Sequence, residues 1–297
     1  MVTFVRVVLR RKCDGSGVGY GGRKETRLAS VLAVALAAFG CGHGVPSVLP
    51  ACQKTGIVKQ SLPSKNFYAA HPELAAVCRL GVTRHRFLHL GSKTYFSTGA
   101  IVEGRYLVTA AHNIATLPGR QLKSIAITCG ASVVRLQNPP QIFAEGKALR
   151  AAVHNPDKYW WKDYPRDYAV LDLEQIGDVP QAIATGPSFE WDSGATPIYA
   201  GQTTLYLAGY PGGSYSAAGT RLRVSDIQAR DCELDHSFVR YPVDTATGNS
   251  GGPVWVNENG RAILVGVHVA SFDFEGGTGG VARRVRLSMV ESWLPRP

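Results

Sequence analysis

Short apolar runs separated by glycine, proline and asparagine turns dominate the sequence after its first forty residues. The runs are rich in Val, Ile and Thr, and their lengths favour β-strands over helices. Clear examples are the ranges 96–102, 106–111, 124–128, 203–208 and 261–267. Helical spacing is confined to the end of the chain, where Leu287, Val290 and Leu294 can pack on one face. The pattern therefore predicts an all-β protein that closes on a short C-terminal helix.

The first forty residues have a different pattern. Arg23, Lys24 and Arg27 precede an apolar stretch over 28–40, which is too short for a membrane-spanning helix and is typical of a secretory signal. The small residues around Phe39 suit cleavage before Cys41. The same stretch weakly resembles a bacterial lipoprotein box, so membrane attachment through a lipidated Cys41 stays open. We expect a leader over 1–40, a possible pro-segment or N-terminal extension over 41–74, and a folded domain over 75–297.

The charge of the chain is mostly explained by this leader. The net charge is +10, and residues 1–40 hold seven basic and two acidic side chains, so half of the excess lies there. The remainder is mildly basic and has no long Lys/Arg tract. We therefore expect no nucleic-acid partner, although a modest positive field can attract acidic substrates.

Four cysteines lie in the part expected to be exported, namely Cys52, Cys78, Cys129 and Cys232. In an oxidising compartment they suggest two disulfides, with three possible pairings among which the sequence does not choose. No CxxC pair is present, and His85 and His89 lack the glutamate of a zinc-protease helix. We expect no metal and no organic cofactor.

A serine between glycines is the strongest chemical signal. Ser250 lies in the segment Asp-Thr-Ala-Thr-Gly-Asn-Ser-Gly-Gly-Pro-Val, residues 244–254, just before an apolar run. Glycines allow a sharp turn and the close approach of a substrate carbonyl. The amides of Gly248 and Ser250 can then point to one spot and stabilise an oxyanion. A hydroxyl needs a base to become a nucleophile, and the base needs a group that orients it.

His112 and Asp167 are the candidates for these two roles. His112 follows an apolar strand that ends in Thr-Ala-Ala, which places an imidazole on a rigid scaffold. Asp167 stands directly before the apolar run 168–171, where a buried carboxylate can accept the imidazole N–H and fix its tautomer. Asp157, Asp163 and Asp172 are weaker candidates, because the first two lie in expected loops and the last is out of phase with the strand.

Thr-Ala-Ala-His, Asp-Tyr-Ala-Val-Leu and Gly-Asn-Ser-Gly-Gly-Pro, in this order, resemble the chymotrypsin-fold serine endopeptidases. The order His, Asp, Ser separates this family from subtilisins and α/β-hydrolases. The resemblance implies two six-stranded antiparallel β-barrels, about 75–190 and about 191–297. It places His112 and Asp167 on the first barrel and Ser250 on the second. It further implies protein or peptide substrates. The leader predicts a secreted or periplasmic location, and we expect a monomer.

Within that family the chain resembles the glutamyl endopeptidase branch most closely. In that branch a threonine and a histidine, which correspond to Thr245 and His268, bind the carboxylate of a substrate glutamate. The Gly-Tyr-Pro-Gly run over 209–212 also fits this branch. Asp244, however, stands where trypsins carry the aspartate that attracts Arg or Lys, so a basic preference is the alternative. A non-catalytic binding protein with the same fold is the third possibility.

Asn249 bears on activation. In trypsin relatives the residue before the serine is an aspartate that pairs with a newly freed N-terminal amine. A neutral Asn249 cannot form that ion pair, so the resemblance predicts that activation does not use it. Trypsins also often carry a disulfide-bonded cysteine directly after the catalytic histidine, and Asn113 occupies that place here.

Overall fold

The structure is a computed structural model, and it describes residues 57–85, 91–114, 122–137, 167–176, 181–194, 203–212, 219–229, 232–234, 237–274 and 277–290. The chain divides into two compact units, residues 1–47 and 48–297, and all described residues belong to the second. The expected leader, Cys41 and Cys52 lie outside the described residues. So do residues 213–218 and the end of the chain from residue 291, which includes Leu294.

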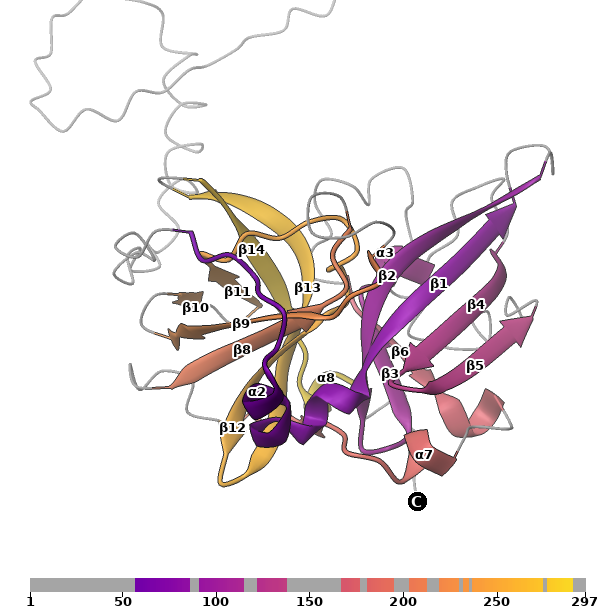
Figure 1. Cartoon of the computed structure of the whole chain (residues 1–297), viewed down its shortest axis with the longest axis horizontal. Helices are drawn as coiled ribbons and strands as arrows, with labels where there is room; N and C mark the ends of the chain where they lie inside the picture. Colours follow the sequence, from indigo (N-terminus) through magenta and orange to yellow (C-terminus); the bar gives the residue numbers. More distant parts are fainter. Residues whose placement is uncertain are drawn as a thin grey trace, which may run out of the picture. The chain divides into compact units, whose positions relative to one another are not determined.

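The first barrel is a six-stranded antiparallel sheet with the order β5-β4-β1-β2-β3-β6 (Figure 1). Its strands are β1 (Val77–His85), β2 (Ser92–Val102), β3 (Tyr106–Thr109), β4 (Leu122–Cys129), β5 (Ser132–Gln137) and β6 (Ala169–Asp172). The turn between β2 and β3 uses positive φ angles at Glu103 (51°) and Gly104 (63°), so it falls where the sequence predicts it.

The second barrel is an eight-stranded sheet with the order β10-β11-β14-β13-β12-β8-β9, and β7 pairs with β13 in parallel. Its strands are β7 (Glu190–Trp191), β8 (Thr204–Gly209), β9 (Arg223–Gln228), β10 (Glu233–Leu234), β11 (Phe238–Tyr241), β12 (Pro253–Glu258), β13 (Arg261–Phe274) and β14 (Gly277–Arg284). The six longer strands form the predicted antiparallel sheet, and β7 and β10 add two residues each. The predicted all-β class and two-barrel architecture are confirmed.

Helices are short among the described residues. They are α2 (Lys65–Ala70), η1 (Pro72–Ala76), α3 (Ala111–Ile114), η4 (Leu173–Ile176), α7 (Gln181–Ala184) and α8 (Leu287–Val290). The predicted C-terminal helix is present as α8. The strand expected over 106–111 ends at Thr109. Helix α3 begins at Ala111, so His112 lies on this helix and not on the strand.

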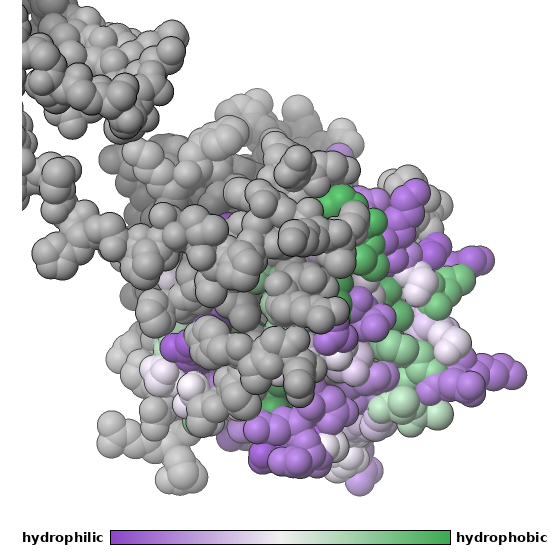
Figure 2. All heavy atoms as spheres, turned by 90° about the vertical axis from the view of Figure 1, so that its left-hand side faces the viewer, coloured by the Kyte–Doolittle hydropathy of each residue, from purple (hydrophilic) through white to green (hydrophobic). Residues whose placement is uncertain are grey.

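Buried side chains form two clusters. One fills the first barrel and continues into the contact between the barrels, where Trp255 and Leu264 of the second sheet join it. The other fills the second barrel and includes Val239, Tyr241 and Val254. On the face shown in Figure 2, hydrophilic side chains cover much of the described surface and hydrophobic ones form smaller areas among them. The two barrels therefore share an apolar contact, and polar groups within that contact must find partners.

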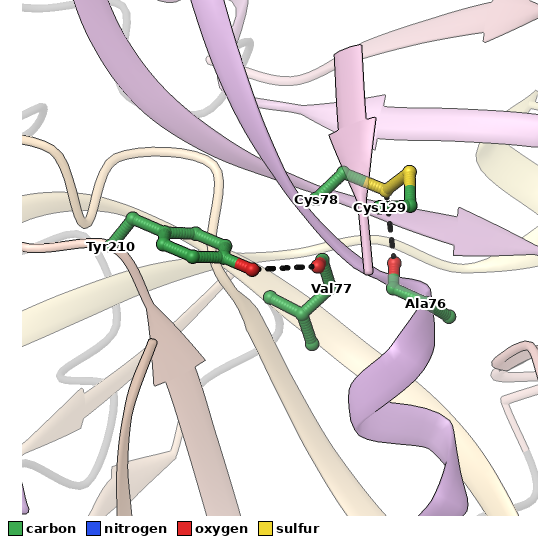
Figure 3. Close-up of a disulfide and its surroundings, with 5 residues drawn as sticks. All are labelled: Ala76, Val77, Cys78, Cys129 and Tyr210. Carbon is green, nitrogen blue, oxygen red and sulfur yellow. Dashed lines mark hydrogen bonds between the residues drawn. A yellow bond between two sulfur atoms is a disulfide. The ribbon is translucent and has the colours of Figure 1, made fainter. Parts of the chain in front are cut away.

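A disulfide joins Cys78 of β1 to Cys129 of β4, which confirms one of the two expected bridges (Figure 3). The two strands are neighbours, and their register places these residues opposite each other. Close by, the Tyr210 hydroxyl of the second barrel donates to the Val77 carbonyl of the first at 3.4 Å. Cys232 is buried, and its thiol lies 3.7 Å from the Gln228 carbonyl.

Residues 57–76, which we call the N-terminal strap, run along the second barrel before β1 begins. Val58 donates to the Pro242 carbonyl at 2.7 Å and accepts from the Asp244 amide at 2.9 Å. Ser61 exchanges two backbone bonds with Val224, each of 2.9 Å. The buried carboxylate of Glu73 accepts from His71 Nδ1 at 2.8 Å and from Trp255 Nε1 at 2.9 Å. Residues 57–74, part of the range expected as pro-segment or extension, thus pack on the fold.

Candidate active site

His112 and Asp167 form a two-point contact. The His112 amide donates to Asp167 Oδ1 at 3.0 Å, and its ring Nδ1 donates to Oδ2 at 2.7 Å. The Asp167 side chain is 4 % exposed and the His112 side chain 24 % exposed. A carboxylate that accepts Nδ1–H fixes the tautomer, so Nε2 is the nitrogen that can take a proton. The structure therefore brings these two residues together.

Ser250 lies on a turn in which two peptide carbonyls accept backbone hydrogen bonds. The Thr247 carbonyl accepts from the Gly212 amide at 2.7 Å, and the Asn249 carbonyl accepts from the Gly252 amide at 2.8 Å. In a trans peptide the N–H points opposite to its carbonyl, and no described peptide bond is cis. The amides of Gly248 and Ser250 are thereby directed away from these anchors. Gly248 has φ of 104°, which glycine adopts most readily.

The turn is also bonded to the first barrel. Thr98 of β2 is fully buried; its amide donates to the Ser250 carbonyl at 2.9 Å and its hydroxyl to the Gly248 carbonyl at 2.7 Å. The Tyr210 amide in turn donates to the Thr98 hydroxyl at 3.0 Å. Thr98 therefore fixes both carbonyls that flank Asn249, and it joins the barrels at the serine turn.

His268 adjoins the same turn from β13. Its amide donates to the Gly252 carbonyl at 2.8 Å, and its carbonyl accepts from the Gly251 amide at 2.7 Å. Burial, and to a smaller extent the neighbouring His112, lowers the His268 pKa to about 3. The imidazole is consequently neutral at ordinary pH.

Tyr241 of β11 contacts the ring of His268, with its hydroxyl 2.6 Å from Nδ1. Burial raises the pKa of Tyr241 well above its ordinary value, so the hydroxyl keeps its proton and can donate it to Nδ1. A neutral imidazole has one N–H, and that hydrogen is on Nε2 in the tautomer whose Nδ1 accepts from Tyr241. Gly280 makes this packing possible, because a Cβ there would lie 2.2 Å from the Tyr241 ring.

The two remaining predicted pocket residues lie before the turn. The Thr245 hydroxyl is 3.3 Å from the Ser271 hydroxyl of β13, so Thr245 faces the strand that carries His268. Asp244 is partly exposed, and its amide is bonded to Val58 of the N-terminal strap.

Asn249 is buried with 2 % exposure, and neither polar atom of its amide has a hydrogen-bond partner among the described residues. Its side chain lies against Gly209, where a Cβ would come within 2.5 Å of the amide oxygen. A carboxylate at this place would be a buried charge, which costs far more than a buried amide.

Two further features are absent from the described residues. No group of three or more His, Cys, Asp or Glu side chains lies together there as metal ligands. No described helix is long and apolar enough to cross a membrane.

Two antiparallel barrels with a His–Asp pair on one and a glycine-flanked serine on the other are the arrangement of trypsin-like serine proteases. The sequence profile described as "Trypsin-like peptidase domain" matches residues 97–267, more than half of the chain. The chain belongs to the trypsin-like peptidase family and is a serine protease.

Three solved protease structures are similar to this chain. The thermostable serine protease AL20 from an extremophilic microorganism is 14% identical, with 75% of this chain and 96% of that chain covered and a TM-score of 0.50. Protease Anisep from Arthrobacter nicotinovorans is 14% identical, covers 75% and 94%, and has a TM-score of 0.49. A Glu endopeptidase is 16% identical, covers 81% and 96%, and has a TM-score of 0.46. No curated protein matches the sequence significantly. At 14% identity the likeness to AL20 concerns the fold alone.

Sequence reasoning missed three contacts. Tyr241 gave no motif, since a tyrosine at a strand end is ordinary. Asn113 was noted only as the place of a missing cysteine. Glu73 and His71 form a buried pair, and the sequence around His71 and Pro72 does not indicate it. Only the short spacing of His71 and Glu73, ahead of an apolar strand, could have hinted at it.

Proposed function

We propose that this protein is a secreted serine endopeptidase that cleaves peptide bonds after glutamate through an acyl-enzyme intermediate. The observation that carries the catalytic part is the double contact of Asp167 with the amide and ring of His112. This contact leaves Nε2 of a partly exposed imidazole to act as the base, beside the turn that presents Ser250.

In the proposed reaction, Ser250 Oγ attacks the substrate carbonyl while His112 Nε2 takes its proton. Asp167 stabilises the imidazolium that forms. The developing oxyanion accepts from the amides of Gly248 and Ser250, whose peptide units are anchored through the Thr247 and Asn249 carbonyls. His112 then protonates the leaving amine, and water releases the acyl group by the reverse sequence.

The preference for glutamate is supported by His268 and Thr245. With Tyr241 donating to Nδ1, His268 offers an Nε2–H donor beside the serine turn. A carboxylate needs hydrogen-bond donors when it is buried, and the Thr245 hydroxyl supplies a second one. Because the His268 pKa is lowered to about 3, the site without substrate presents a neutral ring, whose contribution to recognition is a hydrogen-bond donor.

The proposed export is supported by the leader pattern over 1–40 and by the Cys78–Cys129 disulfide. Disulfides form and persist mainly in oxidising compartments.

The catalytic proposal is tested with a fluorophosphonate probe, which reacts with activated serines. We expect the wild type to be labelled at Ser250 and Ser250→Ala to be unlabelled, with turnover reduced by about 10⁶. Ser132→Ala, which changes a serine at the start of β5, is the matched control. It should keep both the labelling and the turnover of wild type. Folded wild type that takes no label would instead support a non-catalytic binding protein.

Specificity is tested by digesting a peptide library and reading the cuts by mass spectrometry. Cuts after Glu support His268 and Thr245 as the carboxylate donors. Cuts after Arg or Lys would reject that assignment and make Asp244 the specificity residue.

A further inference from the structure

Asn113 follows the proposed base directly and has a buried side chain with 9 % exposure. Its amide nitrogen donates to Thr109 Oγ1 at 2.9 Å and to the Ser250 carbonyl at 2.8 Å. A side-chain amide has two N–H donors, so both are used, one within the first barrel and one across to the second.

The Ser250 carbonyl is therefore held by two donors, and both belong to the first barrel. One is the Thr98 amide at 2.9 Å, and the other is Asn113 Nδ2 at 2.8 Å. A carbonyl oxygen has two lone pairs, so this acceptor is saturated. The residue proposed as nucleophile is thus fixed by the barrel that carries the proposed base.

Asn113 is itself rigidly placed relative to His112. Its backbone amide donates to the Ala110 carbonyl at 3.1 Å, and this bond closes the turn of α3. The guanidinium of Arg84 on β1 donates to the carbonyls of His112 and Asn113, at 3.1 Å and 2.8 Å. His112 is consequently connected to the backbone of Ser250 through one peptide bond, the short side chain of Asn113 and one hydrogen bond.

Gly251 shows how closely the two barrels approach at this contact. A Cβ on Gly251 would lie 2.1 Å from Thr109 Oγ1, 2.1 Å from the Thr98 carbonyl oxygen and 2.8 Å from Asn113 Nδ2. The side chain of Asn113 and its partner thus occupy the space beside the serine turn.

We propose that Asn113 is a positioning residue, whose amide holds the Ser250 backbone in register with His112 for proton transfer. The inference rests on the catalytic roles proposed above. Proton transfer requires heavy atoms within hydrogen-bond reach, and a displacement of about 1 Å can lower the rate by about 10². Asn113 takes this part where a disulfide would stand in trypsins.

The experiment compares Asn113→Ala and Asn113→Leu with wild type in the full chain. Asn113→Leu is close in size, uncharged and without amide donors, so it keeps the test valid if Asn113→Ala does not fold. We expect kcat to fall by about 10- to 100-fold in both, KM to change by less than about threefold, and the rate of fluorophosphonate labelling to fall with kcat. Val134→Ala, in edge strand β5, is a control that lowers stability away from the site and should keep kcat.

The outcomes separate this inference from the proposed function. Labelled wild type with folded Asn113 variants of unchanged kcat would overturn the positioning role alone. The positioning role would also be overturned if kcat fell only in proportion to the fraction of folded protein, and if Val134→Ala showed the same proportion between kcat and folded protein. Wild type that takes no label at Ser250 would overturn the proposed function and this inference together.

Discussion

The hydroxyl of Tyr241 and the Nδ1 atom of His268 are 2.6 Å apart in the interior of the second barrel. When the tyrosine donates in this bond, Nδ1 is the acceptor and the hydrogen of the neutral ring is on Nε2. The pair converts an uncharged ring into a directional donor. In the function proposed above, such a site recognises a carboxylate by hydrogen bonding from a ring that is uncharged at ordinary pH.

Replacing Tyr241 by Phe should impair recognition of glutamate. Without the donor at Nδ1 the ring can adopt the other tautomer, which offers no hydrogen from Nε2. We expect kcat/KM for a substrate with Glu before the scissile bond to fall about tenfold, as for a lost hydrogen bond to a charged group. A substrate with Gln there should change less. Tyr106→Phe, on a buried tyrosine of β3, is the control; equal losses for both substrates would contradict the prediction.

The lowered pKa of His268 predicts a dependence of stability on pH. Unfolding returns the pKa from about 3 to its ordinary value of 6.5. Between these values the unfolded chain binds a proton that the folded chain does not, so the free energy of unfolding decreases as the pH falls through this window. Above about pH 7 the residue contributes nothing, because it is neutral in both states.

We therefore expect the melting temperature of wild type to fall from about pH 6.5 towards acid more steeply than that of His268→Gln. Circular dichroism melts at several pH values measure both curves. If the two curves ran parallel, His268 would not be the group that titrates.

Two glycines with similar backbones should respond differently to alanine. Gly251 and Gly260 have φ of 84° and 79°, but a Cβ meets atoms at 2.1 Å in Gly251 and nothing within 4 Å in Gly260. Gly260→Ala should cost only the backbone strain, about 1 kcal/mol, and keep full activity. Gly251→Ala should push the barrels apart and abolish fluorophosphonate labelling. Labelling of folded Gly251→Ala at the wild-type rate would show that the close approach is unnecessary.

Asn249→Asp tests the meaning of the neutral amide before the serine. The buried side chain has no described partner, so ionisation there would leave an unpaired charge, which we expect to cost about 3 kcal/mol or more. Urea unfolding should show this loss, while Asn257→Asp at an exposed position of β12 should change little. Undiminished stability of Asn249→Asp would indicate that a cation reaches this place.

The local elements of the site follow from the sequence because each has a strong signal. The strand before His112, the aspartate before an apolar run and the glycine turn around Ser250 are set by neighbours in the chain. The pairing of His112 with Asp167 follows from the family order of these residues. The structure adds the distances and the burial of the carboxylate.

The contacts that no pattern indicates are those between distant segments. Nothing local marks Asn113 as a donor to Ser250, because the acceptor is a backbone carbonyl of the other barrel. Tyr241 and His268 meet because β11 and β13 both pair with β14. The two-residue strands β7 and β10 are too short to give any periodicity.

The N-terminal strap has a consequence for the order in which this protein is completed. Val58 pairs with Val243, and Glu73 bonds Trp255, so the earliest described residues depend on strands made near the end of synthesis. Contacts of such long range form slowly, since the intervening chain must first be ordered. A ribosome-bound chain that lacks β12 has no Trp255 to receive Glu73. The beginning of the described fold is therefore among the last parts to settle, and its contacts can be completed only after the chain has been made as far as Trp255.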